Sequence, residues 1–185
     1  MTTALNKLQQ LLADRSARRG KFTLSSGRES TLYIDARLTT MSPEGLILIG
    51  ELGLNALESS AWNVQSVGGL TLGADPVAYA IAYSSARSAH PVRAFTVRKE
   101  AKAHGTGQLI EGPFMKGDRV AIVEDVITTG ASALKAAAAV KAAGGVVVGV
   151  LAVIDREEGG REAIEAAGLP VLAITKADTI IARMS

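Results

Sequence analysis

The chain has 185 residues, of which 48% are hydrophobic and only 4% aromatic, and its formal net charge is +2. This length predicts one domain with a full hydrophobic core, while the few aromatic residues and the small charge argue against a nucleic-acid-binding surface. The sequence has no cysteine, which excludes disulfides and thiol catalysis. We see neither a signal peptide nor an apolar stretch of membrane-spanning length, so a cytoplasmic protein without membrane contact is expected.

The N-terminal third predicts a helix, a hairpin and a second helix. Leucines recur at helical spacing in residues 3–19, and two arginines with Gly20 would end that helix. Residues 21–37 alternate apolar and polar side chains around a Ser-Gly turn, which favours two short strands. Ser42 and the proline after it form a helix start, and apolar residues at helical spacing continue to about Ser59.

A glycine-rich segment follows the next predicted strand. Residues 64–67 are predicted to be a short strand that runs into Gly-Gly-Leu-Thr-Leu-Gly-Ala-Asp-Pro at 68–76. The first and last glycines have the outer spacing of a nucleotide P-loop, but alanine and aspartate stand where that motif requires lysine and serine or threonine. The P-loop interpretation therefore fails. Asp75 is instead predicted to cap a helix that continues from Val77.

A charged stretch comes after the following strand. Residues 92–97 are predicted to be that strand, and Arg-Lys-Glu-Ala-Lys-Ala-His-Gly follows at 98–105. Residues 99–107 lack sustained periodicity and hold two glycines, which predicts a mobile loop. Taken alone, the stretch also fits an ordinary charged surface hairpin.

The most informative stretch begins with four apolar residues at 120–123, which are typical of a strand buried on both faces. Glu124 and Asp125 come next, and Thr-Thr-Gly-Ala-Ser at 128–132 leads into an alanine-rich helix at 133–143. Ligands of open α/β sheets bind beyond the carboxyl ends of strands, and a helix start offers free N–H groups to an anion. The turn therefore suits a phosphate, and the two acids suit hydroxyls or a cation. A helix cap alone would explain the threonines but not the paired carboxylates.

The C-terminal part completes a strand–helix alternation. Residues 146–154 are predicted to be another buried strand, and Arg156 follows it in an acidic turn, where a lone arginine is usually a solvated salt-bridge partner. A short helix at 163–167, a strand at 171–174 and a helical turn capped by Asp178 come last. This alternation predicts an α/β fold with a doubly wound, mostly parallel sheet and a small N-terminal hood.

Five of these stretches, in this order, resemble the orotate phosphoribosyltransferases among the type I phosphoribosyltransferases. They are the 21–37 hairpin, the 68–76 segment, the string Arg-Lys-Glu-x-Lys-x-His-Gly, the acid pair with its turn, and Asp-Arg-x-Glu-Gly after the 146–154 strand. The resemblance implies one phosphoribosyltransferase domain over residues 1–185, with a hood at about 1–40 and a mobile catalytic loop at about 98–112.

The same resemblance implies a reaction. Orotate and 5-phosphoribosyl-1-pyrophosphate (PRPP) would give orotidine 5′-monophosphate and pyrophosphate, a step of pyrimidine (UMP) biosynthesis, through an oxocarbenium-like displacement at ribose C1. Mg²⁺ would be held mainly through PRPP, with no separate metal site in the protein. A homodimer is also implied, in which the catalytic loop of each subunit covers the site of its neighbour.

Roles for individual residues follow from the resemblance. The acid pair would hold the ribose hydroxyls, the turn would hold the 5′-phosphate, and the loop cations would neutralise the pyrophosphate. The catalytic residues would be Lys99, Lys102, His104, Glu124 and Asp125. PRPP would be bound by Thr71, Gly73, Arg98, Lys99, Lys102, His104, Glu124, Asp125, Thr128, Thr129, Gly130, Ala131 and Ser132. Orotate would be bound by Tyr33, Ile34, Thr128 and Arg156.

Two positions depart from the family pattern, because Ser25 and Leu72 stand where relatives have lysine. The remaining cations near the anionic substrate therefore gain importance. Two other functions would also use a PRPP site. A PRPP-sensing regulator would have lost the loop cations or the base-binding arginine, and a purine phosphoribosyltransferase would lack this loop and the Asp155–Arg156 turn. This chain has all of these features.

Overall fold

The computed structural model describes residues 3–23, 29–100 and 108–184. Two sheets and seven helices are present in these ranges. The elements in chain order are α1 (Thr3–Arg15), β1 (Ala17–Thr23), β2 (Glu29–Ile34), α2 (Arg37–Thr40), α3 (Pro43–Glu58), β3 (Ser66–Leu70), α4 (Ala74–Ser85), β4 (Arg93–Val97), β5 (Ile110–Glu111), β6 (Arg119–Ile127), α5 (Ala131–Ala142), β7 (Val146–Asp155), α6 (Gly160–Ala166), β8 (Val171–Lys176) and α7 (Ala177–Ile181).

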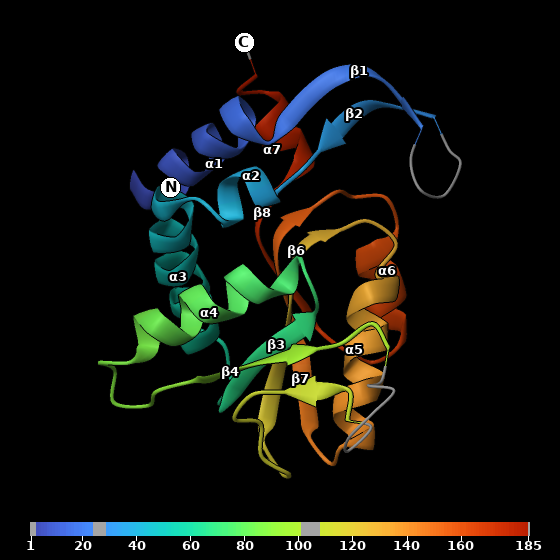
Figure 1. Cartoon of the computed structure of the whole chain (residues 1–185). Helices are drawn as coiled ribbons and strands as arrows, with labels where there is room; N and C mark the ends of the chain where they lie inside the picture. The colour runs from blue at the N-terminus through green and yellow to red at the C-terminus, as the bar shows by residue number, and fades with distance from the viewer. Residues whose placement is uncertain (1–2, 24–28, 101–107, 185) are drawn as a thin grey trace.

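The larger sheet has the strand order β5-β4-β3-β6-β7-β8, and every pair in it is parallel except β4 with β5. Helices α3 and α4 cover one face, while α5 and α6 cover the other (Figure 1). This architecture confirms the predicted doubly wound, mostly parallel sheet. The carboxyl ends of β3, β4, β6 and β7 consequently meet at one edge, where the connecting turns form a site.

The strand β6 shows why the sheet is central to the core. Its successive side chains alternate between two buried clusters, because neighbouring residues on a strand point to opposite faces. Ala121 and Val123 pack under α3 and α4, whereas Val120 and Ile122 pack against α5. All four are fully buried, as the continuous apolar stretch predicted.

The smaller sheet is an antiparallel hairpin of β1 and β2, which stands beside α1 and α7 (Figure 1). The hairpin confirms the two strands predicted in this region, but the helix predicted over residues 3–19 is too long. Helix α1 ends at Arg15, and Ala17 already pairs with Ile34. Cross-strand pairing, which is not visible in the local sequence, outweighs the helical spacing there.

Several element boundaries also differ from the predicted ones. Strand β3 continues through Gly68 and Gly69, where the neighbouring Phe95 and Val123 lie too close for a side chain. Helix α4 begins before Asp75, which lies in its first turn and is not its cap; Asp178 has the same position in α7. Within the described residues, no helix has both the length and the apolar character needed to cross a membrane.

Candidate active site

The two acids lie inside β6, which runs beyond them to Ile127. Glu124 is only 7% exposed, and its Oε2 atom has no hydrogen-bond partner among the described residues. Asp125 is half-buried, and its Oδ1 accepts a hydrogen bond from the N–H of Val126 at 2.9 Å. An unpaired buried carboxylate oxygen is costly unless a ligand or a proton satisfies it.

Burial changes the protonation of this pair. Desolvation, helped by the neighbouring Asp125 carboxylate, raises the pKa of Glu124 to about 8. Burial also raises the pKa of Asp125, although hydrogen bonds from the backbone and the charge of Arg37 act in the opposite direction. The free protein therefore carries a proton on Glu124 at neutral pH, and ligand hydroxyls or a cation would compete with that proton.

This raised pKa predicts a pH-dependent stability in the free protein. Unfolded Glu124 ionises near pH 4.5, whereas folded Glu124 ionises near pH 8. The folded state binds the extra proton between these values, so its contribution to stability is complete below pH 4.5 and is lost as pH rises toward 8. We expect the unfolding free energy of the parent, relative to Glu124→Gln, to fall across this window by at most about 1.4 kcal/mol per pH unit. Denaturant unfolding of both proteins at pH 4 to 9 measures this difference in unfolding free energy. A difference that does not change with pH would contradict the raised pKa of Glu124.

The 128–132 turn joins β6 to α5 and forms a small cavity of about 60 Å³, lined by the turn itself with Glu124, Val126 and Ile127. Gly130 has a φ of +79°, a left-handed conformation that favours glycine, and it immediately precedes α5. The first-turn N–H groups of this twelve-residue helix face the turn and have no intrahelical acceptors. The structure thus places N–H groups of a helix start next to the acid pair, an arrangement that suits an anion.

The turn after β6 touches the turn after β7 through two glycines. A Cβ atom on Gly130 would lie 2.7 Å from the carbonyl oxygen of Gly160, and a Cβ atom on Gly160 would lie 2.5 Å from the carbonyl oxygen of Thr128. Only glycine allows these main chains to approach so closely. The contact places the 128–132 turn directly beside the turn that carries Arg156.

Arg156 is nearly buried, with a side chain only 7% exposed. Its guanidinium pairs with Glu158 at 2.6 Å and contacts the carbonyl oxygen of Leu32 in the hairpin at 3.5 Å. The Nε atom has no partner in the described part of the chain. This is not the solvated surface arginine that an acidic turn usually holds, since a buried guanidinium with an unused donor suits a planar carboxylate.

The hairpin contributes Tyr33 and Ile34 in different ways. Tyr33 is 40% exposed and its ring packs on Phe22 with a centroid distance of 5.3 Å. Ile34 is buried in the core cluster with Leu8, so its side chain packs the hairpin against the core. Of the two orotate contacts predicted in the hairpin, Tyr33 thus offers an accessible side chain, whereas the side chain of Ile34 is buried.

Two of the predicted loop residues lie at the end of β4. The N–H of Arg98 donates to the carbonyl oxygen of Leu109 at 2.8 Å, and its guanidinium lies 3.6 Å from Glu111. The carbonyl oxygen of Lys99 accepts a hydrogen bond from Lys135 of α5 at 2.8 Å. These bonds hold the base of the loop beside the helix that begins at the 128–132 turn. Lys102 and His104, like Ser25, lie outside the described residues.

The 71–73 loop lies between β3 and α4 and reaches the acid pair. Gly73 is close to Asp125, because a Cβ atom added to it would lie 2.5 Å from the Asp125 Oδ1 atom. The hydroxyl of Thr71 donates to Asp75 at 2.7 Å. The structure therefore brings the predicted residues Thr71 and Gly73 to the same edge as Glu124 and Asp125.

Sequence reasoning overlooked two charged residues beside this site. Arg37 forms a bidentate ion pair with Asp35, at 2.8 and 3.0 Å, and its charge partly opposes the burial that raises the pKa of Asp125. Both residues follow the hairpin, far from Asp125 in sequence. Their spacing signals an ion pair but does not reveal what the pair faces. Arg37 thus brings a positive charge near the acid pair, although Asp35 partly offsets it.

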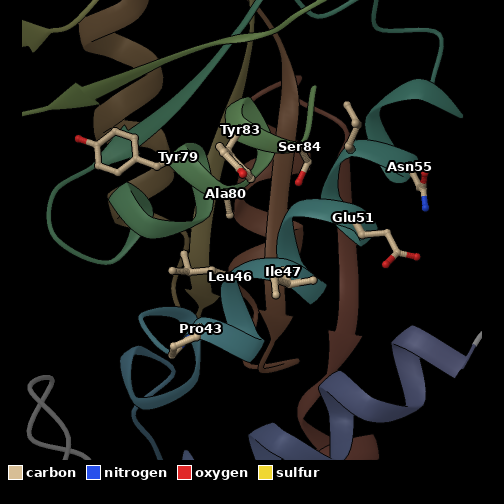
Figure 2. A pocket seen from close by; sticks show the side chains of 10 residues that line it. Pro43, Leu46, Ile47, Glu51, Asn55, Tyr79, Ala80, Tyr83 and Ser84 are labelled. Carbon is tan, nitrogen blue, oxygen red and sulfur yellow. The ribbon is translucent and has the colours of Figure 1, made fainter. Parts of the chain in front are cut away.

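A separate apolar groove, the α3/α4 groove, lies on the helices that cover the opposite face of the sheet from α5 (Figure 2). Its volume is about 670 Å³. Ile47 is 69% exposed, Tyr79 52% and Tyr83 85%, which is unusual for side chains of this size. The groove is lined by Pro43, Leu46, Ile47, Glu51, Leu54, Asn55, Tyr79, Ala80, Tyr83 and Ser84.

Comparisons with known proteins agree on one family. The chain is 47% identical over 178 residues to an orotate phosphoribosyltransferase of Aquifex aeolicus, covering 95% of this chain and 96% of that protein. It is 51% identical over 166 residues to one from Mycobacterium avium, covering 90% of each. The solved structure of the Mycobacterium tuberculosis H37Rv orotate phosphoribosyltransferase in complex with PRPP superposes with a TM-score of 0.81 at 44% identity, covering 96% of this chain and 98% of that one. No family model matches the chain.

Proposed function

The chain belongs to the orotate phosphoribosyltransferase family, and on this premise we propose how its residues divide the work of the reaction. The protein is a glycosyltransferase that converts orotate and PRPP into orotidine 5′-monophosphate and pyrophosphate in pyrimidine biosynthesis. One observation supports the assignment of residues above all. The 71–73 loop, the acid pair, the 128–132 turn and the turn that carries Arg156 lie at the same edge of the sheet.

The ribose phosphate end of PRPP belongs at β6. The N–H groups at the start of α5 and the hydroxyls of Thr128, Thr129 and Ser132 bind the 5′-phosphate, since the helix dipole favours an anion there. Glu124 and Asp125 accept hydrogen bonds from the ribose hydroxyls. The unpaired Glu124 Oε2 atom supports this role, because binding a hydroxyl supplies the partner that it lacks in the free protein.

The pyrophosphate end belongs between the 71–73 loop and the catalytic loop. Arg98, Lys99, Lys102 and His104 neutralise charge that grows on the leaving pyrophosphate, and Gly73 lets its backbone approach the phosphates. Lys99 is held near the 128–132 turn through Lys135. Closure of the loop would exclude water, which could otherwise hydrolyse PRPP.

The orotate ring belongs between the hairpin and the turn after β7. Arg156 binds the orotate carboxylate through its planar guanidinium, Thr128 adds a hydroxyl, and Tyr33 covers the ring from the hood. The contact between Arg156 and the backbone of Leu32 supports this arrangement, because it joins the two elements that must enclose the base. The protein needs no covalent nucleophile for a displacement through an oxocarbenium-like state at ribose C1.

Mg²⁺ fits the donors that the site provides. Glu124 and Asp125 offer carboxylate oxygens, while the described residues contain no group of three or more side chains that would form a complete metal site. A hard cation that retains waters and binds substrate phosphates needs no more than this. When bound, the ion would offset the charge of the pyrophosphate group.

Turnover should consequently depend on both PRPP and Mg²⁺. Initial rates of orotate consumption are expected to rise to a plateau as MgCl₂ is added and to return to background with excess EDTA. Omitting PRPP should abolish the signal at every Mg²⁺ concentration. A rate that EDTA leaves unchanged would contradict the proposed cofactor.

A homodimer is the proposed working state. The exposed Ile47, Tyr79 and Tyr83 of the α3/α4 groove support it, because a soluble monomer rarely leaves such a surface uncovered. A two-fold dimer would also allow the catalytic loop of one subunit to reach the site of the other, as the family resemblance implies.

Subunit exchange tests the shared loop. We expect Lys102→Ala and Arg156→Ala to be poorly active alone and to recover about a quarter of parental activity after equal mixing and exchange. In the mixed dimer, the site of the Lys102→Ala chain keeps its own Arg156 and receives an intact loop from its partner. Activity is measured beside a tag-based count of mixed dimers. Verified exchange without recovery would refute a loop shared between subunits.

A further inference from the structure

A chain of hydrogen bonds links the 71–73 loop to α4 and β4. The two carboxylate oxygens of Asp75 accept from different hydroxyls, Thr71 at 2.7 Å and Thr96 of β4 at 2.8 Å. The hydroxyl of Tyr79, one helical turn beyond Asp75, lies 2.9 Å from that of Thr96. A helix start, a strand and a loop therefore meet at a single carboxylate.

The Asp75 carboxylate accepts the hydrogen bonds from both threonines, and this fixes the direction of the bond between Tyr79 and Thr96. Thr96 uses its only hydroxyl proton on Asp75, so the hydroxyl of Tyr79 must be the donor to Thr96. Thr71 likewise uses its hydroxyl proton on Asp75. An ionised carboxylate strengthens both threonine bonds, because a charged acceptor makes a shorter and stronger hydrogen bond than a neutral one.

The same bonds leave Thr71 without a free donor. Its backbone N–H donates to the carbonyl oxygen of Val97 at 2.8 Å, and its hydroxyl is committed to Asp75. The next two residues differ: within the described part of the chain, the N–H groups of Leu72 and Gly73 have no acceptor. These are the donors that the loop presents at the start of α4, beside Asp125.

We infer that Asp75 is a positioning residue, which fixes Thr71 so that the N–H groups of Leu72 and Gly73 face the pyrophosphate of PRPP. This inference rests on the proposed pyrophosphate role of the 71–73 loop and changes the part assigned to Thr71. Thr71 acts as the anchor of the loop and not as a direct ligand of the phosphates.

A double-mutant cycle separates an anchor from a ligand. Thr71→Val and Asp75→Ala each remove one end of the same hydrogen bond, so each should raise the KM for PRPP about tenfold. The double variant should match Asp75→Ala alone, because without Asp75 the hydroxyl of Thr71 has no bond left to lose, whereas Asp75→Ala by itself also removes the bond from Thr96. The KM for orotate should stay within about twofold of the parent value. Thr71→Ser, which keeps the hydroxyl, should restore the parental KM for PRPP.

Asp178→Ala is the matched control. Asp178 follows an alanine in the first turn of α7, as Asp75 does in α4, but it is exposed and lies far in sequence from the 71–73 loop. It reports any general effect of losing a first-turn aspartate, and melting temperatures of all variants report any loss of folding. The control should keep the parental KM for PRPP.

Three results would overturn the inference. A rise of about a hundredfold in the double variant would show that Thr71 and Asp75 act independently. An equal rise in the KM for both substrates would indicate general damage, and an unchanged KM for PRPP would show that the anchor is irrelevant. Calorimetric titration with pyrophosphate repeats the cycle without turnover. An inactive parent would thus count against the enzymatic assignment, while the pyrophosphate cycle would still decide the role of Asp75.

Discussion

Asp125→Asn should lower turnover by about a hundredfold or more while leaving the fold intact. Asn keeps the shape of the side chain and can still accept the hydrogen bond from the N–H of Val126. Under the proposed assignment, it removes the negative charge that would hold the ribose hydroxyls and stabilise positive charge developing at ribose C1. The effect should appear in kcat, because that charge matters most in the transition state. Steady-state rates of orotate consumption measure it.

The control for this change is Asp178→Asn, which alters an exposed carboxylate on α7 and should leave the rate unchanged. Circular dichroism and a melting curve establish that the Asp125 variant is folded. A folded Asp125→Asn protein with parental turnover would show that the acid pair has another role.

Arg156→Ala should weaken orotate by more than tenfold, and PRPP much less. The variant loses a charged, two-point contact with a carboxylate, and such a contact contributes about 2 kcal/mol or more. The effect should be strong because the guanidinium is nearly buried and therefore poorly screened by water. Titrations of each substrate against the inactive protein measure the two affinities separately.

Arg156→Lys provides the comparison that isolates geometry from charge. Lysine keeps the positive charge but lacks the planar guanidinium, so it should recover only part of the orotate affinity. An equal loss of affinity for both substrates in Arg156→Ala would argue that the residue supports the whole site rather than the base.

The sequence was informative where chemistry and local structure coincide. The β6 stretch carries its strand signal, its acids and its turn within thirteen residues, so the buried strand and the turn leading into a helix at its end could both be predicted. The start of α3 could also be predicted from neighbouring residues, because the Ser42 side chain accepts a hydrogen bond from the N–H of Gly45, as the Ser-Pro pair indicated.

What the sequence did not reveal depends on packing between distant segments. Asp75 looked like a helix cap, but its partners include Thr96 on a neighbouring strand. The charge of Arg37 acts on Asp125 although the two residues are far apart in the sequence, and only the assembled fold brings them within range. The raised pKa of Glu124 likewise needs the burial that the assembled sheet provides, and composition or spacing cannot supply that information.

The contact between Gly130 and Gly160 has a consequence for ligand length. The main chains of the two turns approach each other directly, with Ile127 and Ile164 packed beside the contact, so the backbone fixes how far the 128–132 turn lies from the turn that carries Arg156. The two glycines cannot alter this distance by a change of rotamer, because glycine has no side chain. Under the proposed assignment, the protein selects ligands by the distance between the 5′-phosphate and the carboxylate, as in its nucleotide product. We therefore expect an analogue whose two anionic groups are set one bond farther apart to bind more weakly than the product.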